Sequence, residues 1–390
     1  MSAVYELRHR DHTVLLFQYS LVRKILEIVS PERLPVPVEN VNDFDRKKFF
    51  DEWYRHRITN IRTREKRPEF SSHRLYDLMS PDCVDINYGA NLADHYWICA
   101  EGSPIKWKDI NFHDNDFDAT DENSLWTSYG KYSPDNHTNG NLRKFWTIQN
   151  GVRYLAKYNS LTYDVYQLGA HNEVFSMKLL QKLGVPCAEY SLAFDEKIGE
   201  PYSLSKCMTD TVYELVPAFL FLSVYPKLNH VSYYDWFLNV CKEKLGIDVR
   251  KQIDEMICLD FLIANEDRHW NNFALLRNSE TLQYVGLAPL YDHEYSMGDF
   301  SEFKTRTFKV NPYAQLKLID SVHSLSVTKD MIEEIWDTVY EERGMSAENL
   351  KNLERVKKAL FSRLTRFDQI LQGKEKQEEQ IETEFQMYTR

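Results

Sequence analysis

Apolar residues recur at helical spacing along several stretches of the chain, and each such stretch ends in residues that stop a helix. Residues 172–184 place Phe175, Leu179 and Leu183 one turn apart, with Asn172 at the N-cap position and Gly184 at the end. Three further helices are predicted in the second half of the chain. One spans about 248–264, one carries Ile332, Ile335, Trp336 and Val339, and one begins near Ser346 and carries Leu350, Leu353, Leu360, Leu364, Phe367 and Leu371.

A β-hairpin is the clearest local pattern in the sequence. The β-prone runs NLRKFWTIQ and VRYLAKY are joined by Asn150-Gly151, and both turn positions require a positive φ that Asn and Gly tolerate. On the second strand Lys157 shares a face with Leu155, so Lys157 projects from a sheet. Residues 188–195 and 202–208 are also predicted to be strands.

Composition shifts divide the chain into four parts. Residues 111–124 are rich in acids and amides, which indicates a linker after a Trp/Tyr/Arg-rich N-terminal region. The predicted parts are an N-terminal recognition or regulatory domain (1–124), a β-rich unit (125–210), a helical unit (211–372) and a charged, solvent-exposed tail (373–390). The predicted class is α+β, with a cleft between the second and third parts.

The net charge limits the classes of partner. A formal charge of −11 argues against a protein whose main task is wrapping nucleic acid. Residues 46–67 are locally basic, with interleaved aromatic side chains. A solvated helix face that buries Phe49, Phe50 and Trp53 is favoured there over a nucleic-acid or phosphoprotein contact.

The cysteines and the apolar runs indicate the cellular compartment of the protein. The six cysteines form no C-x-x-C pair, which favours reduced thiols over a disulfide framework or structural zinc. The N-terminus does not resemble a signal peptide, and no run reaches the ~18 apolar residues that a membrane span needs. A cytoplasmic protein without a membrane span is therefore expected.

Two polar segments stand beside apolar ones and carry the candidate chemistry. NEDRHWNN, residues 265–272, follows the apolar run MICLDFLIA, and Asp267 precedes Asn272 by five residues, as the catalytic Asp of a protein kinase precedes a metal-binding Asn. Asp292, in LAPLYDHE, follows after an expected strand-turn-strand. Because a hairpin returns the chain to its origin, Asp292 and Asn272 are expected to face the same Mg²⁺.

Upstream residues complete a set suited to ATP. Lys157 on its strand and Glu173 on the next helix are placed as a kinase places its phosphate-holding lysine and partner glutamate. Backbone amides near Gly140 are expected to cradle phosphates. Ser133 and Thr138 in the same loop are candidates for autophosphorylation, although loop hydroxyls that stabilise turns explain them equally well.

These segments together resemble the HipA-like kinases and the related CtkA-like bacterial kinases, over roughly residues 128–371. The resemblance implies a bilobal protein-kinase-like fold related to lipid kinases, with ATP- and Mg²⁺-dependent Ser/Thr phosphorylation. It implies Asp267 as catalytic acid/base, His269 as the loop histidine, Asn272 and Asp292 as magnesium ligands, and Lys157 as the phosphate-binding lysine. Order along the chain then puts adenine near Ser205 and Met208, in the expected hinge.

Several alternatives remain open at this point. The acceptor hydroxyl is expected on a protein Ser or Thr, and a phosphoinositide or small-molecule alcohol is the second choice. A nucleotide-binding pseudokinase acting as an interaction module, with an antitoxin-like or other regulatory partner, is the third. A transition-metal site is a further interpretation of His269, His293, Asp292 and Glu294, but the spacing of these residues matches no zinc motif.

Overall fold

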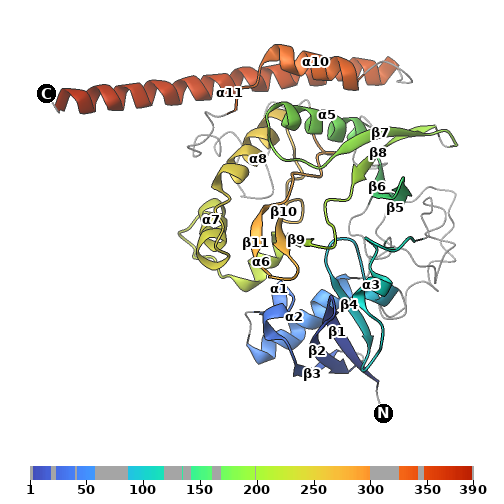
Figure 1. Ribbon diagram of the computed structural model, residues 1–390. Helices are drawn as coiled ribbons and strands as arrows, with labels where there is room; N and C mark the ends of the chain where they lie inside the picture. The colour runs from blue at the N-terminus through green and yellow to red at the C-terminus, as the bar shows by residue number, and fades with distance from the viewer. Residues whose placement is uncertain are drawn as a thin grey trace.

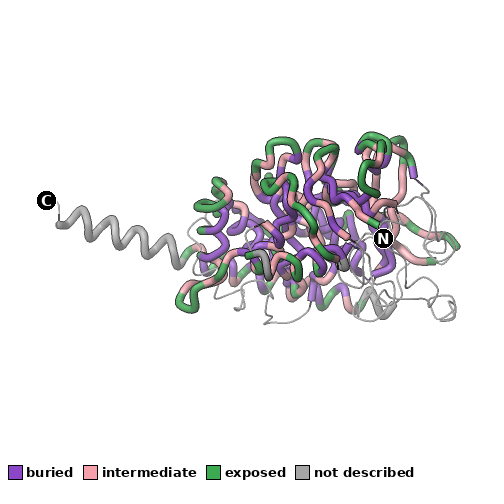
Figure 2. Tube along the Cα trace, turned by 90° about the horizontal axis from the view of Figure 1, so that it is seen from below, coloured by how far each residue is buried: buried purple, intermediate pink, exposed green. Residues whose placement is uncertain are grey.

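The computed structural model describes residues 3–18, 23–39, 42–57, 87–117, 134, 142–159, 168–197, 199–298, 325–340 and 347–388. Within these ranges the predicted α+β class is confirmed, because three antiparallel sheets are combined with separate helices (Figure 1). Buried segments occupy the middle of the tube in Figure 2 and exposed segments its rim. None of the helices in these ranges combines the length and hydropathy needed to cross a bilayer.

The N-terminal region forms the first sheet, in the order β3-β2-β1-β4. Its core contains Leu7, Phe17, Phe50 and Tyr54, so the basic segment buries one aromatic face as predicted, within the described residues up to Arg57. The elements are β1 (Val4–His9), β2 (His12–Gln18), β3 (Lys24–Ile28), η1 (Pro31–Arg33), α1 (Val36–Glu39), α2 (Asp43–His56), η5 (Asn87–Gly89), β4 (Tyr96–Ala100) and α3 (Trp107–Ile110).

The second sheet has the order β5-β6-β8-β7 and contains the predicted hairpin. Asn150 and Gly151 adopt φ 52° and 78° between the two strands, which confirms the turn. The elements are β5 (Lys144–Gln149), β6 (Val152–Tyr158), α5 (Gly169–Lys182), β7 (Tyr190–Asp195) and β8 (Glu200–Lys206).

The rest of the chain joins a third sheet, β11-β10-β9, to a group of helices. The largest hydrophobic cluster runs from α5 through these helices, and Phe175 packs edge-on against Trp336. The elements are β9 (Tyr213–Pro217), α6 (Phe219–Val224), α7 (Tyr233–Lys244), α8 (Arg250–Ile263), β10 (Ala274–Asn278), β11 (Tyr284–Leu287), α10 (Lys329–Val339) and α11 (Ala347–Tyr388). The helices predicted near 248, 332 and 346 are therefore confirmed.

A buried carboxylate joins the N-terminal sheet to the third sheet. Glu214 on β9 has no exposed surface, and it accepts hydrogen bonds from Arg277 Nε (2.8 Å), from the backbone N–H of His95 (3.0 Å) and from the ring of His9 (3.1 Å). Burial raises the pKa of Glu214, but Arg277 and His9 outweigh it and hold that pKa far below its usual value. The fully paired charge thus links the two sheets.

Two local predictions are wrong. Asn172 is not an N-cap, because α5 begins at Gly169 after Leu168. Residues 111–117 are not a linker, because Phe112 and Phe117 are buried and Arg153 on β6 donates to Phe112 O at 3.0 Å. The predicted tail from residue 373 is part of α11, which continues as a helix to Tyr388 and extends past the rest of the molecule in Figure 1.

The buried His171 and the half-buried His113 predict loss of stability in mild acid. Burial lowers the pKa of His171 to about 4 and, together with His95, that of His113 to about 3. Since the unfolded chain takes up these protons near pH 6.5, the stabilisation is complete above that pH and is lost as the pH falls towards the folded-state values. At pH 5 each histidine is expected to lower the free energy of unfolding by about 2 kcal/mol relative to pH 7.

Urea unfolding of His171→Phe at both pH values tests this expectation. Phe keeps the ring that stacks on Tyr340 at 5.9 Å, so the variant should lose less stability between pH 7 and pH 5 than the wild type. His230, whose side chain is exposed, gives the matched substitution, His230→Phe. Equal acid sensitivity of wild type and His171→Phe would contradict the assignment.

Candidate active site

Lys157 lies at the inner end of β6 and pairs with Glu173 of α5. Its Nζ is 2.5 Å from Glu173 Oε1, and Lys157 and Glu173 expose 9% and 0% of their surface. Ser203 stands opposite Lys157 on β8 and donates a short hydrogen bond to Glu173 Oε2. The strand-helix pair predicted from the sequence is therefore formed and locked in one geometry by a third side chain.

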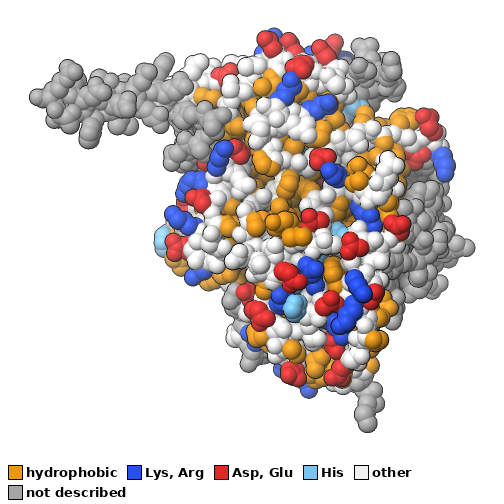
Figure 3. All heavy atoms as spheres, viewed as in Figure 1, with side chains coloured by type: hydrophobic (Ala, Val, Ile, Leu, Met, Phe, Trp, Pro, Cys, Tyr) orange, Lys and Arg blue, Asp and Glu red, His pale blue; other side chains and the backbone are white. Residues whose placement is uncertain are grey.

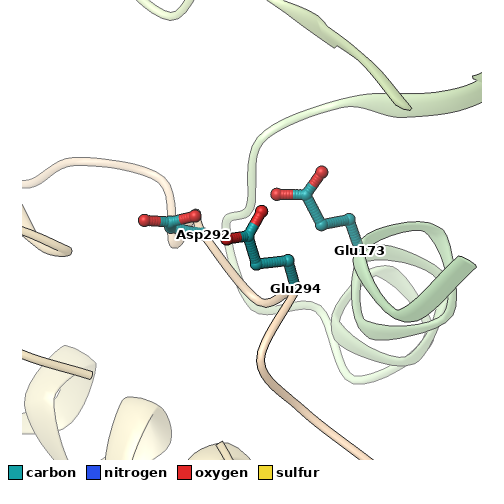
Figure 4. A group of neighbouring side chains, drawn as sticks. All are labelled: Glu173, Asp292 and Glu294. Atoms are coloured by element: carbon teal, nitrogen blue, oxygen red, sulfur yellow. The ribbon is translucent and has the colours of Figure 1, made fainter. Parts of the chain in front are cut away.

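Asp292 and Glu294 meet the same lysine. Lys157 Nζ is 2.6 Å from Asp292 Oδ1 and 2.9 Å from Glu294 Oε2. Figure 4 shows the three carboxylates turned toward one another, Glu173 from α5 and the other two from the segment after β11. Oxygens of this group all lie within 4.8 Å of one another, a spacing that suits a metal ion. The ammonium group of Lys157 already contacts all three, so the cation of this triad is Lys157.

The pKa values of the three carboxylates in the triad are shifted in different directions. Burial raises the pKa of Glu294 to about 8 and also raises that of Glu173, in each case against the lowering effect of Lys157. Burial acts in the same direction on Asp292, but the ion pair with Lys157 outweighs it and holds the pKa of Asp292 below its usual value. The ionised form is therefore favoured at Asp292 and disfavoured at Glu173 and Glu294.

The segment 265–272 is built on the end of α8. Ala264 ends the helix with φ 51°, and Asn265 then donates from its side chain to Asp260 at 2.9 Å. Asn272 Nδ2 donates to the backbone oxygen of Asp267 at 2.8 Å, so the loop closes on itself. His269 Nε2 lies 3.7 Å from Asp267 Oδ2. Asp267 and Asn272 are thereby held as one unit.

Arg268 joins this loop to the segment that carries Asp292. Its Nη1 donates to the backbone oxygens of Asn272, at 2.5 Å, and Tyr291, at 2.7 Å. Its Nε and Nη2 bind the carboxylate of Asp260 at 3.0 and 3.1 Å, and only 1% of Arg268 is exposed. The two polar segments are thus adjacent in space, as the strand-turn-strand between them predicted.

Backbone contacts fix Asp292 from the other side. Leu290 N donates to Pro186 O at 3.0 Å, and Ala188 N donates to Leu290 O at 2.9 Å. Asp292 itself has φ 62° and donates its N–H to the Tyr190 hydroxyl at 3.1 Å. The chain just before β7 therefore holds the Asp292 segment beside the second sheet.

Arg268→Lys is expected to lower the free energy of unfolding by about 2–4 kcal/mol, because one ammonium cannot replace a buried guanidinium that serves three partners. Urea denaturation measures the effect. Arg250→Lys is the matched control, since Arg250 is exposed and its Nη1 donates to Tyr234 at 3.2 Å. Unchanged stability of Arg268→Lys would show that the two segments are held together by other contacts.

The other predicted site residues have different outcomes. Ser205 lies in β8 between Leu155 and Tyr190, and Met208 packs against the main core, in the connection from the second sheet to the third. Gly140, Ser133 and Thr138 lie outside the described residues. The proposed phosphate cradle and its autophosphorylation therefore stay predictions.

Several residues with evident roles were not identified from the sequence. Arg268 and Ser203 owe their positions to chain segments far away. Glu294 was considered from the sequence only as part of a transition-metal site and not as a partner of Lys157. Lys144 faces Lys157 across the β5–β6 hairpin and lowers the pKa of Asp292, so a second lysine borders the site. Its position at the start of the predicted hairpin, opposite Lys157, could have identified Lys144 from the sequence.

The oxygen donors near Arg268 suit a magnesium ion. Asn272 and Asp292 offer an amide and a carboxylate oxygen, the ligand types that hard divalent cations select. In the part of the chain that the structure describes, Asp292 Oδ1 binds Lys157, while Asp292 Oδ2 and Asn272 Oδ1 accept no hydrogen bond. Asn272 and Asp292 therefore offer donor groups of the kind that the predicted Mg²⁺ requires, and Asp292 also belongs to the triad.

Comparisons with known proteins give a family and two distant structures. The family model for the HipA-like C-terminal domain matches residues 136–360, more than half of the chain. A search of curated proteins finds no match. The Helicobacter pylori proinflammatory kinase CtkA is 19% identical with a TM-score of 0.47, and the match covers 58% of this chain and 92% of CtkA.

The second structure is the Shewanella oneidensis toxin-antitoxin complex of HipA, HipB and operator DNA. Its matching chain is 11% identical with a TM-score of 0.47, and the match covers 94% of this chain and 99% of that one. The family assignment depends on the domain model, which spans β5 to α11 and includes Lys157, Glu173, the Asp267–Asn272 loop and Asp292. The chain belongs to the HipA-like C-terminal domain family.

Proposed function

We propose that the protein transfers the γ-phosphoryl group of ATP to a hydroxyl group, with a protein Ser or Thr as the favoured acceptor. The observation that carries the proposal is the double hydrogen bond of Arg268 Nη1, which holds the Asp267–Asn272 loop beside the segment of Asp292. Lys157 reaches Asp292 from the second sheet at 2.6 Å. Membership of the HipA-like family supports the same assignment.

Each of these residues has a distinct role in the proposal. Asp267 accepts the hydrogen bond of the incoming hydroxyl and orients it, and His269 stands beside that carboxylate. Asn272 and Asp292 hold Mg²⁺, which neutralises phosphate charge when bound. Lys157, fixed by Glu173, holds the α- and β-phosphates.

The remaining contacts of the nucleotide follow from the arrangement of the strands. Lys144 adds positive charge next to Lys157 on the paired strand. Residues Ser205 to Met208 are proposed to bind adenine, because they connect the second sheet to the third. Backbone amides near Gly140 are proposed to cover the phosphates.

The N-terminal domain is proposed to recognise a substrate or an antitoxin-like or other regulatory partner protein in the cytoplasm. Its sheet is tied to β9 through the buried Glu214 and through the hydrogen bond from Leu215 N to Ala93 O, 2.8 Å. A partner that binds this domain would therefore contact a part of the protein that is bonded directly to the part with the candidate site.

Transfer of labelled γ-phosphate from MgATP tests the proposal and separates the acceptors. The full chain is incubated with a casein-type protein, with phosphoinositide vesicles, or alone. Labelled protein supports the Ser/Thr assignment, and labelled lipid supports the alternative of an alcohol or phosphoinositide kinase. Nucleotide binding without any transfer would leave the pseudokinase alternative and overturn the proposed activity.

A further inference from the structure

A cavity of about 560 Å³ lies outside the candidate active site, where the N-terminal domain meets the helical part of the chain. It is lined by Val36 and Glu39 of α1, by Phe221 and Tyr225 of α6, by Lys244 at the end of α7 and by Tyr284 at the start of β11. None of these residues contacts Lys157 or the Asp267–Asn272 loop in the interactions of the described residues. A volume of this order is within the range of small-molecule sites.

Aromatic rings form one wall of the cavity. Phe221 stacks on Tyr225 with ring centroids 6.3 Å apart and 16° between planes, and it meets Tyr284 edge-on at 5.9 Å. The Arg277 guanidinium also lies over Tyr284, 5.9 Å from the ring centroid. The faces of such rings attract cations as well as apolar groups.

Glu39 supplies a carboxylate without a bonded partner. Its side chain is half-buried, and the contacts of the described residues give it no hydrogen bond and no ion pair within 4 Å. Burial raises the pKa of Glu39, and the more distant charge of Arg277 lowers it only in part. A desolvated carboxylate of this kind gains from a cation placed in the cavity.

On the face shown in Figure 3, hydrophobic side chains gather in the middle of the molecule, with acidic and basic groups interspersed around them. Lys244 is exposed and borders the cavity without forming an ion pair with Glu39 in these contacts. The lining therefore carries one half-buried carboxylate, Glu39, and one exposed ammonium group, Lys244. Because Glu39 is the less solvated of the two, it gains more from an opposite charge placed in the cavity.

We propose that this cavity binds an organic cation, an amine or guanidinium group on an apolar body, with Glu39 as the counter-ion and Tyr225 and Tyr284 as the aromatic wall, which the buried Phe221 supports from behind. The ligand would contact α1 on one side and α6 and β11 on the other. Binding would thus stabilise the junction between the N-terminal domain and the helical part. The proposal stands independently of the phosphoryl-transfer activity.

Isothermal titration of the full chain tests the proposal with phenethylamine, Nα-acetyl-lysine methylamide and the neutral 2-phenylethanol. We expect at least one of the two cations to bind at least tenfold more tightly than the alcohol. Tighter binding of the lysine derivative would assign the site to a protein side chain, and tighter binding of phenethylamine to a free amine. Both outcomes support the site.

Glu39→Gln should weaken binding of the preferred cation at least tenfold, because the amide keeps the shape and loses the charge. Glu243→Gln removes a charge from the exposed face of α7 beside the cavity and should leave the affinity unchanged. Circular dichroism confirms that both variants fold. Failure of both cations to bind at about 10 mM, equal binding of the alcohol, or an unchanged affinity of Glu39→Gln would overturn the proposal.

Discussion

Asp267→Asn is expected to lower phosphoryl transfer about 100- to 10,000-fold while the protein stays folded and binds nucleotide. The substitution keeps the side-chain shape but removes the carboxylate that accepts the hydrogen bond of the incoming hydroxyl. The loop should keep its conformation, because Asn272 Nδ2 bonds to the backbone oxygen of Asp267 and not chiefly to its side chain. The measurement is the initial rate of γ-phosphate transfer under saturating MgATP.

Glu196→Gln is the control for this variant, since Glu196 lies exposed in the turn between β7 and β8 and its loss changes the net charge equally. It should transfer phosphate at the wild-type rate. A rate within a factor of about three for Asp267→Asn would remove Asp267 from the proposed chemistry.

Asp292→Asn is expected to lower transfer at least about 100-fold and to raise the Mg²⁺ concentration needed for half-maximal rate. The amide keeps an oxygen donor but loses the charge that makes a carboxylate a strong ligand of Mg²⁺. The fold should survive, because Glu173 and Glu294 still contact Lys157 at 2.5 and 2.9 Å. Rates measured across a magnesium titration give both quantities.

Glu294→Gln is the matched comparison, because Glu294 contacts the same lysine and belongs to the same group of carboxylates. With the metal on the Asn272 side of Asp292, the magnesium dependence of Glu294→Gln should shift much less than that of Asp292→Asn. An equal shift in both variants would place the metal within the triad instead, and would contradict the assignment of Lys157 as its cation.

Local patterns predicted much of the fold, because each depends on neighbours in the chain. The Asn150-Gly151 turn needs only two residues that tolerate positive φ, and helix α8 needs only its apolar run and its end. The pairing of Lys157 with Glu173 followed from their order on a strand and the next helix. The structure brings these two side chains to 2.5 Å.

Tertiary contacts account for what the sequence did not reveal. Asn172 has the residue type of an N-cap, yet its amide donates to the backbone oxygens of Glu294 and Ser296, both at 2.9 Å, and accepts from the Tyr340 hydroxyl at 2.8 Å. These distant partners outweigh a local capping preference. The role of Arg268 depends in the same way on a backbone oxygen 23 residues away.

The described part of the polar segment, residues 111–117, shows the same limit. Its composition indicated a linker, because acids and amides outnumber apolar residues. Phe112 and Phe117 nevertheless pack edge-on at 5.7 Å in a cluster with Trp97 and Trp107. Two aromatic side chains are enough to hold a polar segment when a hydrophobic surface is already formed nearby.

The central claim is that the loop of Asp267 and the segment of Asp292 serve one divalent ion and one nucleotide. A crystal structure with a non-hydrolysable ATP analogue and Mn²⁺ tests it most directly, because anomalous scattering locates the metal. We predict one metal peak in contact with both Asn272 and Asp292, with Lys157 on the phosphates. A metal bound to neither side chain, or to Asp292 only together with Glu173 and Glu294, would contradict the account.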